Sequence, residues 1–194
     1  MKQIKIKVMV ITWSVLIIVS CTNSAKINTS NVGKPKENQV AAVDTANQSV
    51  ITSDVIDKEV IDGWLKKSIT QQIVIDKIGN PDKKGEDLYL GATGTYAQTW
   101  EYISIGISLE MESESQGGDK TVRSITITQP CKLTTSQGIS IGSDAKTVKE
   151  KYQKFIDKSN TDENGIVVGS IYGGIIFTLK DGAVSEIFIG AAAE

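Results

Sequence analysis

A stretch of strictly alternating apolar residues, and a second stretch with apolar residues at matching places, constrain the fold of this chain most. The first stretch comprises Ile103, Ile105, Ile107, Leu109 and Met111. The second follows 68 residues later and comprises Ile171, Ile175, Phe177 and Leu179. Alternation with a period of two places such side chains on one face of a β-strand. The sequence therefore predicts two long amphipathic strands, the first of them unbroken from Trp100.

A short helix is expected ahead of each of these strands. In the first, Thr70 is a good N-cap, Val74 and Ile78 share one face, and Gly79 with Pro81 forms a strong stop. In the second, Ser143 or Asp144 caps the helix, Val148 and Tyr152 form the buried stripe, and charged residues fill the outer face.

The same order of elements therefore occurs twice. A further strand pair, Ile125 with Ile127 and Ile187 with Ile189, is offset by 62 residues. The turn at 180–182 closes the second hairpin, and a polar loop around 117–118 closes the first. These patterns predict an α+β fold of two tandem helix-plus-antiparallel-hairpin repeats, about 60–130 and 131–194, which form a sheet with helices packed on one face.

The start of the folded part has two interpretations. Val60 and Ile61, followed by Asp62 and Gly63, fit a short strand and turn. A helix across residues 54–67 is the competing prediction.

The N-terminus has the three parts of a secretory signal. Lys2, Lys5 and Lys7 precede an apolar stretch at 8–19, which is too short to span a bilayer as a helix. It ends in Ile-Val-Ser-Cys at 18–21, which resembles a bacterial lipobox. We expect residues 1–20 to be a cleaved signal peptide and Cys21 to be acylated with fatty acid such as palmitate. The alternative is an ordinary signal peptide with a chance cysteine.

Residues 21–52 are then the acylated cysteine and a flexible linker, because the polar composition of 22–52 cannot bury enough surface to fold. Residues 53–194 form the α+β domain. Removal of the three signal lysines changes the net charge from −2 to −5. An acidic chain without a basic run favours neither nucleic acid nor an anionic membrane surface as a partner, so the lipid provides the bilayer anchor. Because Thr22 is not acidic, we expect the outer membrane, with the domain facing the periplasm.

The pattern Thr70-x3-Val74-x3-Ile78-Gly79-x-Pro81, followed by Trp100-x-Tyr102 and a hairpin, resembles the SmpA/OmlA (BamE-like) lipoproteins of outer-membrane assembly. Two such units in tandem are similar to the β-lactamase-inhibitor-protein fold. The stretches 138–152, 169–179 and 187–194 are also similar to lipoproteins of Bacteroidetes-like bacteria. The resemblance covers about residues 60–194 and implies a fold more than an activity.

No residue pattern typical of catalysis is found. The chain has no histidine, which excludes His-based acid–base chemistry and the commonest zinc ligand. A serine–lysine pair is left open, although no motif frames one. Glu110, Glu112 and Glu114 could bind calcium, but a solvated strand face is the favoured interpretation. Cys131 is expected to be a half-buried, inert thiol rather than a reactive one. We expect no cofactor, no metal and no enzymatic activity.

Aromatic and aliphatic residues are expected on the sheet face away from the helices. By strand parity this candidate partner-binding group comprises Trp100, Tyr102, Tyr172, Ile176 and Phe188. The alternatives are that a bulge near Gly106 or Gly173 returns some of them to the core, or that the linker covers them.

The leading functional hypothesis is a membrane-anchored, non-catalytic binding module for a protein or envelope polymer. The second hypothesis is an inhibitor of a periplasmic or secreted enzyme, which the tandem fold implies by analogy alone. An enzyme is the third.

Overall fold

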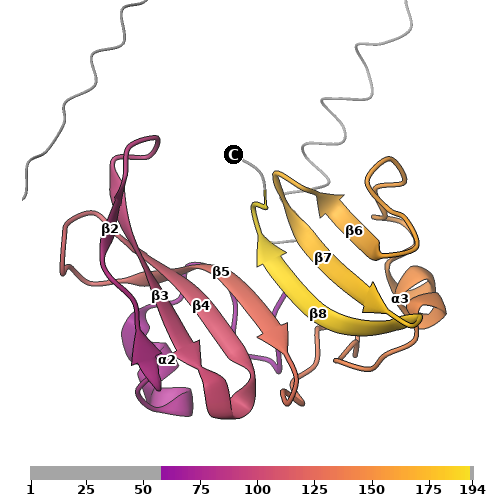
Figure 1. The fold of residues 1–194 in the computed structure, drawn as a ribbon, viewed down its shortest axis with the longest axis horizontal. Coiled ribbons are helices and arrows are strands. Elements are labelled where there is room, and N and C mark those ends of the chain that lie inside the picture. The colour runs from indigo at the N-terminus through magenta and orange to yellow at the C-terminus, as the bar shows by residue number, and fades with distance from the viewer. Residues whose placement is uncertain (1–57, 193–194) are drawn as a thin grey trace, which may run out of the picture. The chain divides into compact units, whose positions relative to one another are not determined.

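The computed structural model describes residues 58–192, which form an α+β fold with an eight-stranded antiparallel sheet and two helices (Figure 1). The expected signal peptide at 1–20, Cys21, the linker and residues 53–57 lie outside the described residues. Within residues 58–192, no helix is long and apolar enough to cross a membrane.

The first part of the chain contains α2 (Gln71–Ile78), β1 (Lys83–Lys84), β2 (Leu88–Leu90), β3 (Thr95–Tyr102), β4 (Ile107–Ser113) and β5 (Thr121–Thr128). The second part contains α3 (Ala145–Tyr152), β6 (Gly165–Ser170), β7 (Gly173–Lys180) and β8 (Ala183–Gly190). The strand order is β1-β3-β4-β5-β8-β7-β6, and β2 also pairs with β3. The two parts of the sheet therefore meet where β5 pairs with β8.

Both helices begin at the residues that the capping pattern indicates. The side chain of Thr70 accepts a hydrogen bond from the backbone N–H of Ile73 at 3.5 Å. Asp144 Oδ1 accepts one from the N–H of Lys146 at 2.6 Å. A side-chain acceptor at the N-cap satisfies one of the free N–H groups of the first turn. Gly79 ends α2 with φ +81°, a conformation that glycine adopts most easily.

One face of the sheet forms the hydrophobic core. Leu109 pairs with Ile125, and Phe177 pairs with Ile187; all four side chains are fully buried. The stripe residues of both helices belong to the same cluster, namely Val74 of α2 and Val148 and Tyr152 of α3. Both helices therefore pack on the same face of the sheet, and the opposite face carries neither (Figure 1).

The expected strand across 103–111 is wrong in its first half. Ile103–Ile105 form a single 3₁₀ turn, and Gly106 follows with φ +68°. This turn reverses the chain, so β3 ends at Tyr102 and β4 begins at Ile107. Ile103 is 65% exposed and Ile105 is 37% exposed, although both continue the alternation. The second expected strand likewise begins only at Gly173, because Ile171 lies in the turn after β6.

Other predicted elements are confirmed. Ile125 with Ile127 and Ile187 with Ile189 lie on β5 and β8 and pair with one another. The turn after β7 uses positive φ angles at Asp181 and Gly182.

Ahead of α2, the predicted turn is present, because Ile61 bridges Leu65 around Asp62 and Gly63. The competing helix is wrong over residues 59–67, which contain no helix, whereas Lys58 is helical and residues 54–57 lie outside the described part of the chain.

The outer edge of β6 is closed by the segment that follows α3. Gly169 N–H donates to the carbonyl of Phe155, and Asp157 N–H donates to the carbonyl of Val167, both at 2.8 Å. Val167 N–H in turn donates to Thr161 Oγ1 at 3.0 Å. The backbone groups of this edge strand are therefore already paired.

Candidate binding surface

Trp100 and Tyr102 do not lie on a solvent-facing surface, which corrects the prediction for these two residues. Trp100 is 1% exposed and Tyr102 is 3% exposed, both within the core cluster. The turn at Gly106 is the physical reason: it makes β3 and β4 a hairpin in which Trp100 pairs with Leu109 and Tyr102 pairs with Ile107. Paired residues share a sheet face, so both aromatic side chains point toward the helices.

The polar atoms of these two aromatics serve the fold. Trp100 Nε1 donates to Gln98 Oε1 at 2.8 Å, and Lys84 Nζ lies 4.0 Å from the centroid of the Trp100 ring. Tyr102 donates its hydroxyl hydrogen to the carbonyl of Gly79 at 3.1 Å, which ties β3 to the end of α2. Burial raises the pKa of Tyr102 to about 12, so this hydroxyl stays a donor at neutral pH.

Ile176 and Phe188 do lie on the sheet face away from the helices, which we call the open face. They pair across β7 and β8, and both are partly exposed. The Phe188 ring leans over the backbone of Gly190. A Cβ atom at position 190 would lie 2.9 Å from Phe188 Cζ and 2.7 Å from the Cβ of Ser124. Gly190 therefore leaves the space that this ring occupies.

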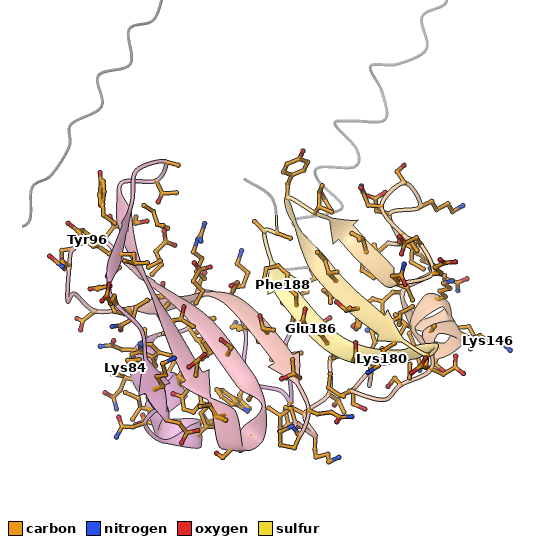
Figure 2. The ribbon with its side chains drawn as sticks, in the orientation of Figure 1. Lys84, Tyr96, Lys146, Lys180, Glu186 and Phe188 are labelled. Carbon is orange, nitrogen blue, oxygen red and sulfur yellow. The ribbon has the colours of Figure 1, made fainter. Side chains whose placement is uncertain are left out.

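The register extends this pair into one continuous row across six strands. The row runs through Glu101, Ser108, Thr126, Phe188, Ile176 and Val167. Its β3–β5 part is acidic or hydroxyl-bearing, and its β6–β8 part is apolar. In Figure 2, Phe188 and Glu186 are seen on β8, beside the junction with β5.

Carboxylates on the open face are held by neighbours on the same face. Lys83 Nζ lies 3.1 Å from Glu101 Oε2, and Arg123 lies 3.0 Å from Glu110. Thr95 Oγ1 donates to Glu112 Oε1 at 2.6 Å. Glu186, also on this face, accepts a hydrogen bond from Thr178 Oγ1 at 3.5 Å.

Tyr172 lies outside the row. It is 70% exposed and belongs to the short turn between β6 and β7, where its N–H donates to Ser170 Oγ. Of the five candidate residues, the structure therefore brings only Ile176 and Phe188 together on the open face.

A buried carboxylate that no sequence pattern indicated joins the start of the domain to α3. Glu59 is 3% exposed, and its Oε2 accepts hydrogen bonds from Tyr152 at 3.1 Å and from Ser136 Oγ at 3.0 Å. Its Oε1 accepts one from the N–H of Ser136 at 2.6 Å. Burial, with the Glu59 carboxylate beside it, raises the pKa of Tyr152 above its ordinary value. These groups are separated by 77 and 93 residues in the chain, so no local motif reveals the cluster.

A serine–lysine contact is present, but it is not arranged for nucleophilic attack. Lys120 Nζ donates to Ser113 Oγ at 3.0 Å, and Ser113 is only 4% exposed. Asp87 Oδ1 lies 2.8 Å from the same ammonium and forms an ion pair with it. Ser113 donates its own hydrogen to the carbonyl of Ser115. A protonated lysine cannot accept a proton from serine, so this cluster braces the loop between β4 and β5.

The placement of the remaining thiol and of the acidic residues in the described part of the chain bears on thiol reactivity and on metal binding. Cys131 is a free, 5% exposed thiol, and burial raises its pKa, which suppresses the reactive thiolate. Within residues 58–192, no group of three or more acidic or cysteine side chains is placed to hold a metal ion.

The comparisons with known proteins add no assignment. No family model matches this chain, and neither a curated protein nor a solved structure matches it. The resemblance to SmpA/OmlA lipoproteins therefore stays a prediction.

Proposed function

We propose that this protein is a lipid-anchored envelope protein that binds a partner protein on its open face and catalyses no reaction. The observation that carries the proposal is the Phe188–Ile176 pair. It stands partly exposed on a sheet face that carries neither helix, at the junction of the two parts of the sheet. Partly exposed aromatic residues with an apolar neighbour are common anchors of protein interfaces.

The charges around this pair define the partner further. Four carboxylates, Glu101, Glu110, Glu112 and Glu186, lie on the open face with three cations, Lys83, Arg123 and Lys180. A partner that fits places an apolar side chain against Phe188 and a basic side chain near the surplus carboxylate.

A non-catalytic role is supported by the state of the polar clusters. Within the described residues, every buried side-chain nitrogen and oxygen has a hydrogen-bond partner. The two clusters that contain nucleophilic or acidic groups, around Ser113 and around Glu59, are buried and use their polar atoms to hold the fold.

We also propose that the domain consists of two tandem repeats. Residue pairs of the first part correspond to pairs of the second: Ile107 with Ile127 matches Ile175 with Ile189. The register shifts at corresponding places too, after Glu110 in β4 and after Thr178 in β7. A shared bulge position supports duplication more strongly than a shared strand order, because bulges are conserved within families.

The proposed anchor is the acylated Cys21 at the outer membrane, with the domain facing the periplasm. The lipobox-like sequence at 18–21 supports it. Metabolic labelling with a fatty acid is expected to mark the protein and to fail for Cys21→Ser. A wild-type protein that takes up no label would contradict the anchor and leave the open-face proposal untouched.

Binding on the open face can be tested by site-specific photo-crosslinking in intact cells. A crosslinker at Thr126, which pairs with Phe188, is expected to capture one discrete protein. The matched control is a crosslinker at Ile73, which is 43% exposed on α2 and therefore lies on the other side of the sheet.

The captured protein is then purified and titrated against variants of the full chain. Phe188→Ala with Ile176→Ser is expected to weaken binding at least about tenfold, as loss of an anchor residue does. Ile73→Ser is expected to leave the affinity unchanged. Equal capture from both positions, or an unchanged affinity of the double variant, would contradict the proposal.

The identity of the captured molecule separates the remaining functions. An enzyme that loses activity on binding would make this protein an inhibitor. Crosslinking to an envelope polysaccharide alone would replace the protein partner, and substrate turnover by the purified chain would overturn the non-catalytic role.

A further inference from the structure

The outward face of α3 concentrates positive charge. Lys146, Lys149 and Lys151 lie on the helix and Lys154 follows it, all with exposed side chains. Glu150 is the one acidic residue within 145–154, and its contact with Lys146 is long, at 3.8 Å, between side chains that are 84% and 64% exposed. Such an exposed pair has little strength. In Figure 2, Lys146 points away from the sheet.

The other lysines of this face are uncompensated. Over the described range 58–192, no carboxylate lies within 4.0 Å of the ammonium groups of Lys149, Lys151 or Lys154. The acidic residue at the start of the helix, Asp144, is already engaged as the N-cap. Residues 145–154 therefore carry four lysines and one acid, a formal charge of +3, although the chain as a whole is acidic.

An exposed aromatic side chain borders this basic face. Phe155 is 39% exposed and follows Lys154 directly. A helix with a lysine-rich face and an aromatic residue at its border has the composition of helices that lie on anionic lipid surfaces.

The other helix of the same layer lacks this charge. The exposed residues of α2 are Gln72, Ile73, Asp76 and Lys77, whose charges cancel. Positive charge is therefore specific to α3 and is no general property of the helix layer.

We propose that the lysine face of α3 docks onto anionic phospholipid headgroups. Charge complementarity selects this occupant. The net charge of −5 expected for the mature chain does not prevent it, because salt screens charges beyond about 10 Å and the headgroups respond to the nearest lysines. The inference draws on the proposed lipid anchor only to bring the domain near the membrane. Since α3 and the open face lie on opposite sides of the sheet, docking leaves Phe188 and Ile176 accessible.

Lysine footprinting on vesicles tests this docking. The full-length protein is extracted from membranes with its lipid and reconstituted on vesicles. One kind of vesicle is phosphatidylcholine alone, and the other contains roughly 30% phosphatidylglycerol, which makes the surface negative. An amine-reactive reagent then reports the reactivity of each lysine by mass spectrometry. Lys149, Lys151 and Lys154 are expected to react at least about fivefold more slowly on the anionic vesicles, since each lysine contributes a factor of roughly five. Lys77 on α2 is the internal control and should react equally on both.

Two further conditions separate charge from proximity. High salt is expected to restore the reactivity of Lys154, because screening removes the attraction. Lys149→Glu with Lys151→Glu is expected to abolish the protection of Lys154, whereas Lys77→Glu preserves it.

Equal reactivity on the two kinds of vesicle overturns the docking, as does protection that appears on neutral vesicles too. Failure of the anchor looks different: the protein then does not sediment with neutral vesicles. Sedimentation and protection on anionic vesicles alone would support the docking without the anchor, and sedimentation with neither would overturn both.

Discussion

The part of the sheet built from β3–β5 and the part built from β6–β8 have similar inner faces and different outer ones. Toward the helices, Leu109 with Ile125 and Phe177 with Ile187 occupy corresponding positions and are fully buried. On the open face, β4 and β5 present hydroxyl and carboxylate groups, whereas β7 and β8 add the Phe188–Ile176 pair beside Thr178 and Glu186.

The two helices differ in the same way. Val74 and Val148 are both buried, yet the outer face of α2 is neutral and that of α3 is basic. This difference shows that burial constrains the residue type at the inner positions only. Substitutions on the inner face should therefore change stability, and substitutions on the outer faces should change binding.

The largest effect is expected from truncation of the inner face. Leu109→Ala and Phe177→Ala should each lower the free energy of unfolding by about 3–5 kcal/mol, from lost burial and the cavity left behind. Because one core cluster spans both parts of the sheet, each variant should unfold in a single transition in urea, followed by circular dichroism. Two transitions, of which only one shifts, would show that the parts are independent.

A smaller effect is expected from the buried carboxylate. Glu59→Gln replaces an acceptor of three hydrogen bonds by an amide whose NH₂ group faces donors, and should cost about 1–3 kcal/mol in urea denaturation. Tyr102→Phe, which removes one hydroxyl bond from the other part of the molecule, should cost about 1 kcal/mol. If Tyr102→Phe lowers the free energy of unfolding more than Glu59→Gln does, the Glu59 cluster does not hold the start of the domain against α3.

The acid side of the stability profile should depend on Asp87. The hydrogen bonds from Lys120 and from the N–H of Gly117 hold the pKa of Asp87 below its ordinary value of 3.8. A lowered pKa in the folded state means that this stabilisation is complete above the unfolded value and is lost as the pH falls through the folded value. Urea denaturation from pH 6 to about pH 3 should show this loss. Asp87→Asn should flatten the slope, and Asp181→Asn at the exposed β7–β8 turn should leave it unchanged.

The smallest effect is expected on the outer face of α3. Lys149→Glu with Lys151→Glu should change the free energy of unfolding by no more than about 0.5 kcal/mol, because exposed residues without close partners contribute little. Thermal unfolding of this variant and of the wild-type protein, measured side by side, tests whether the stability is unchanged. A large loss would mean that these lysines serve the fold and would remove the basis for a separate membrane role.

Local signals allowed much of the fold to be predicted. Thr70 and Asp144 act as caps, and Val74, Val148 and Tyr152 are buried, because capping and helical periodicity depend on neighbours within one turn. The α+β class and the antiparallel sheet follow from the same signals and from strand alternation.

The open face could not be predicted fully, because strand parity breaks at a single residue. Ile103 and Ile105 continue the alternation, yet Gly106 reverses the chain and moves Trp100 and Tyr102 to the core. Of the predicted group, only Ile176 and Phe188 were placed correctly on that face, because no reversal of this kind interrupts β7 or β8 between them and their core neighbours.

Contacts between distant residues left no trace in the sequence. The Glu59 and Lys120 clusters join residues far apart in the chain. The charged outer side of α3, by contrast, was predicted from the buried stripe of Val148 and Tyr152.

The paired edge of β6 has a consequence for a protein that is concentrated on a membrane surface, as proposed for this one. Molecules confined to two dimensions meet often, and an unpaired edge strand would let neighbouring copies associate edge to edge into extended sheets. With Val167 and Gly169 already bonded to the segment after α3, that route is closed at this end of the sheet. Copies gathered in one patch can therefore stay individual molecules, each with its own open face.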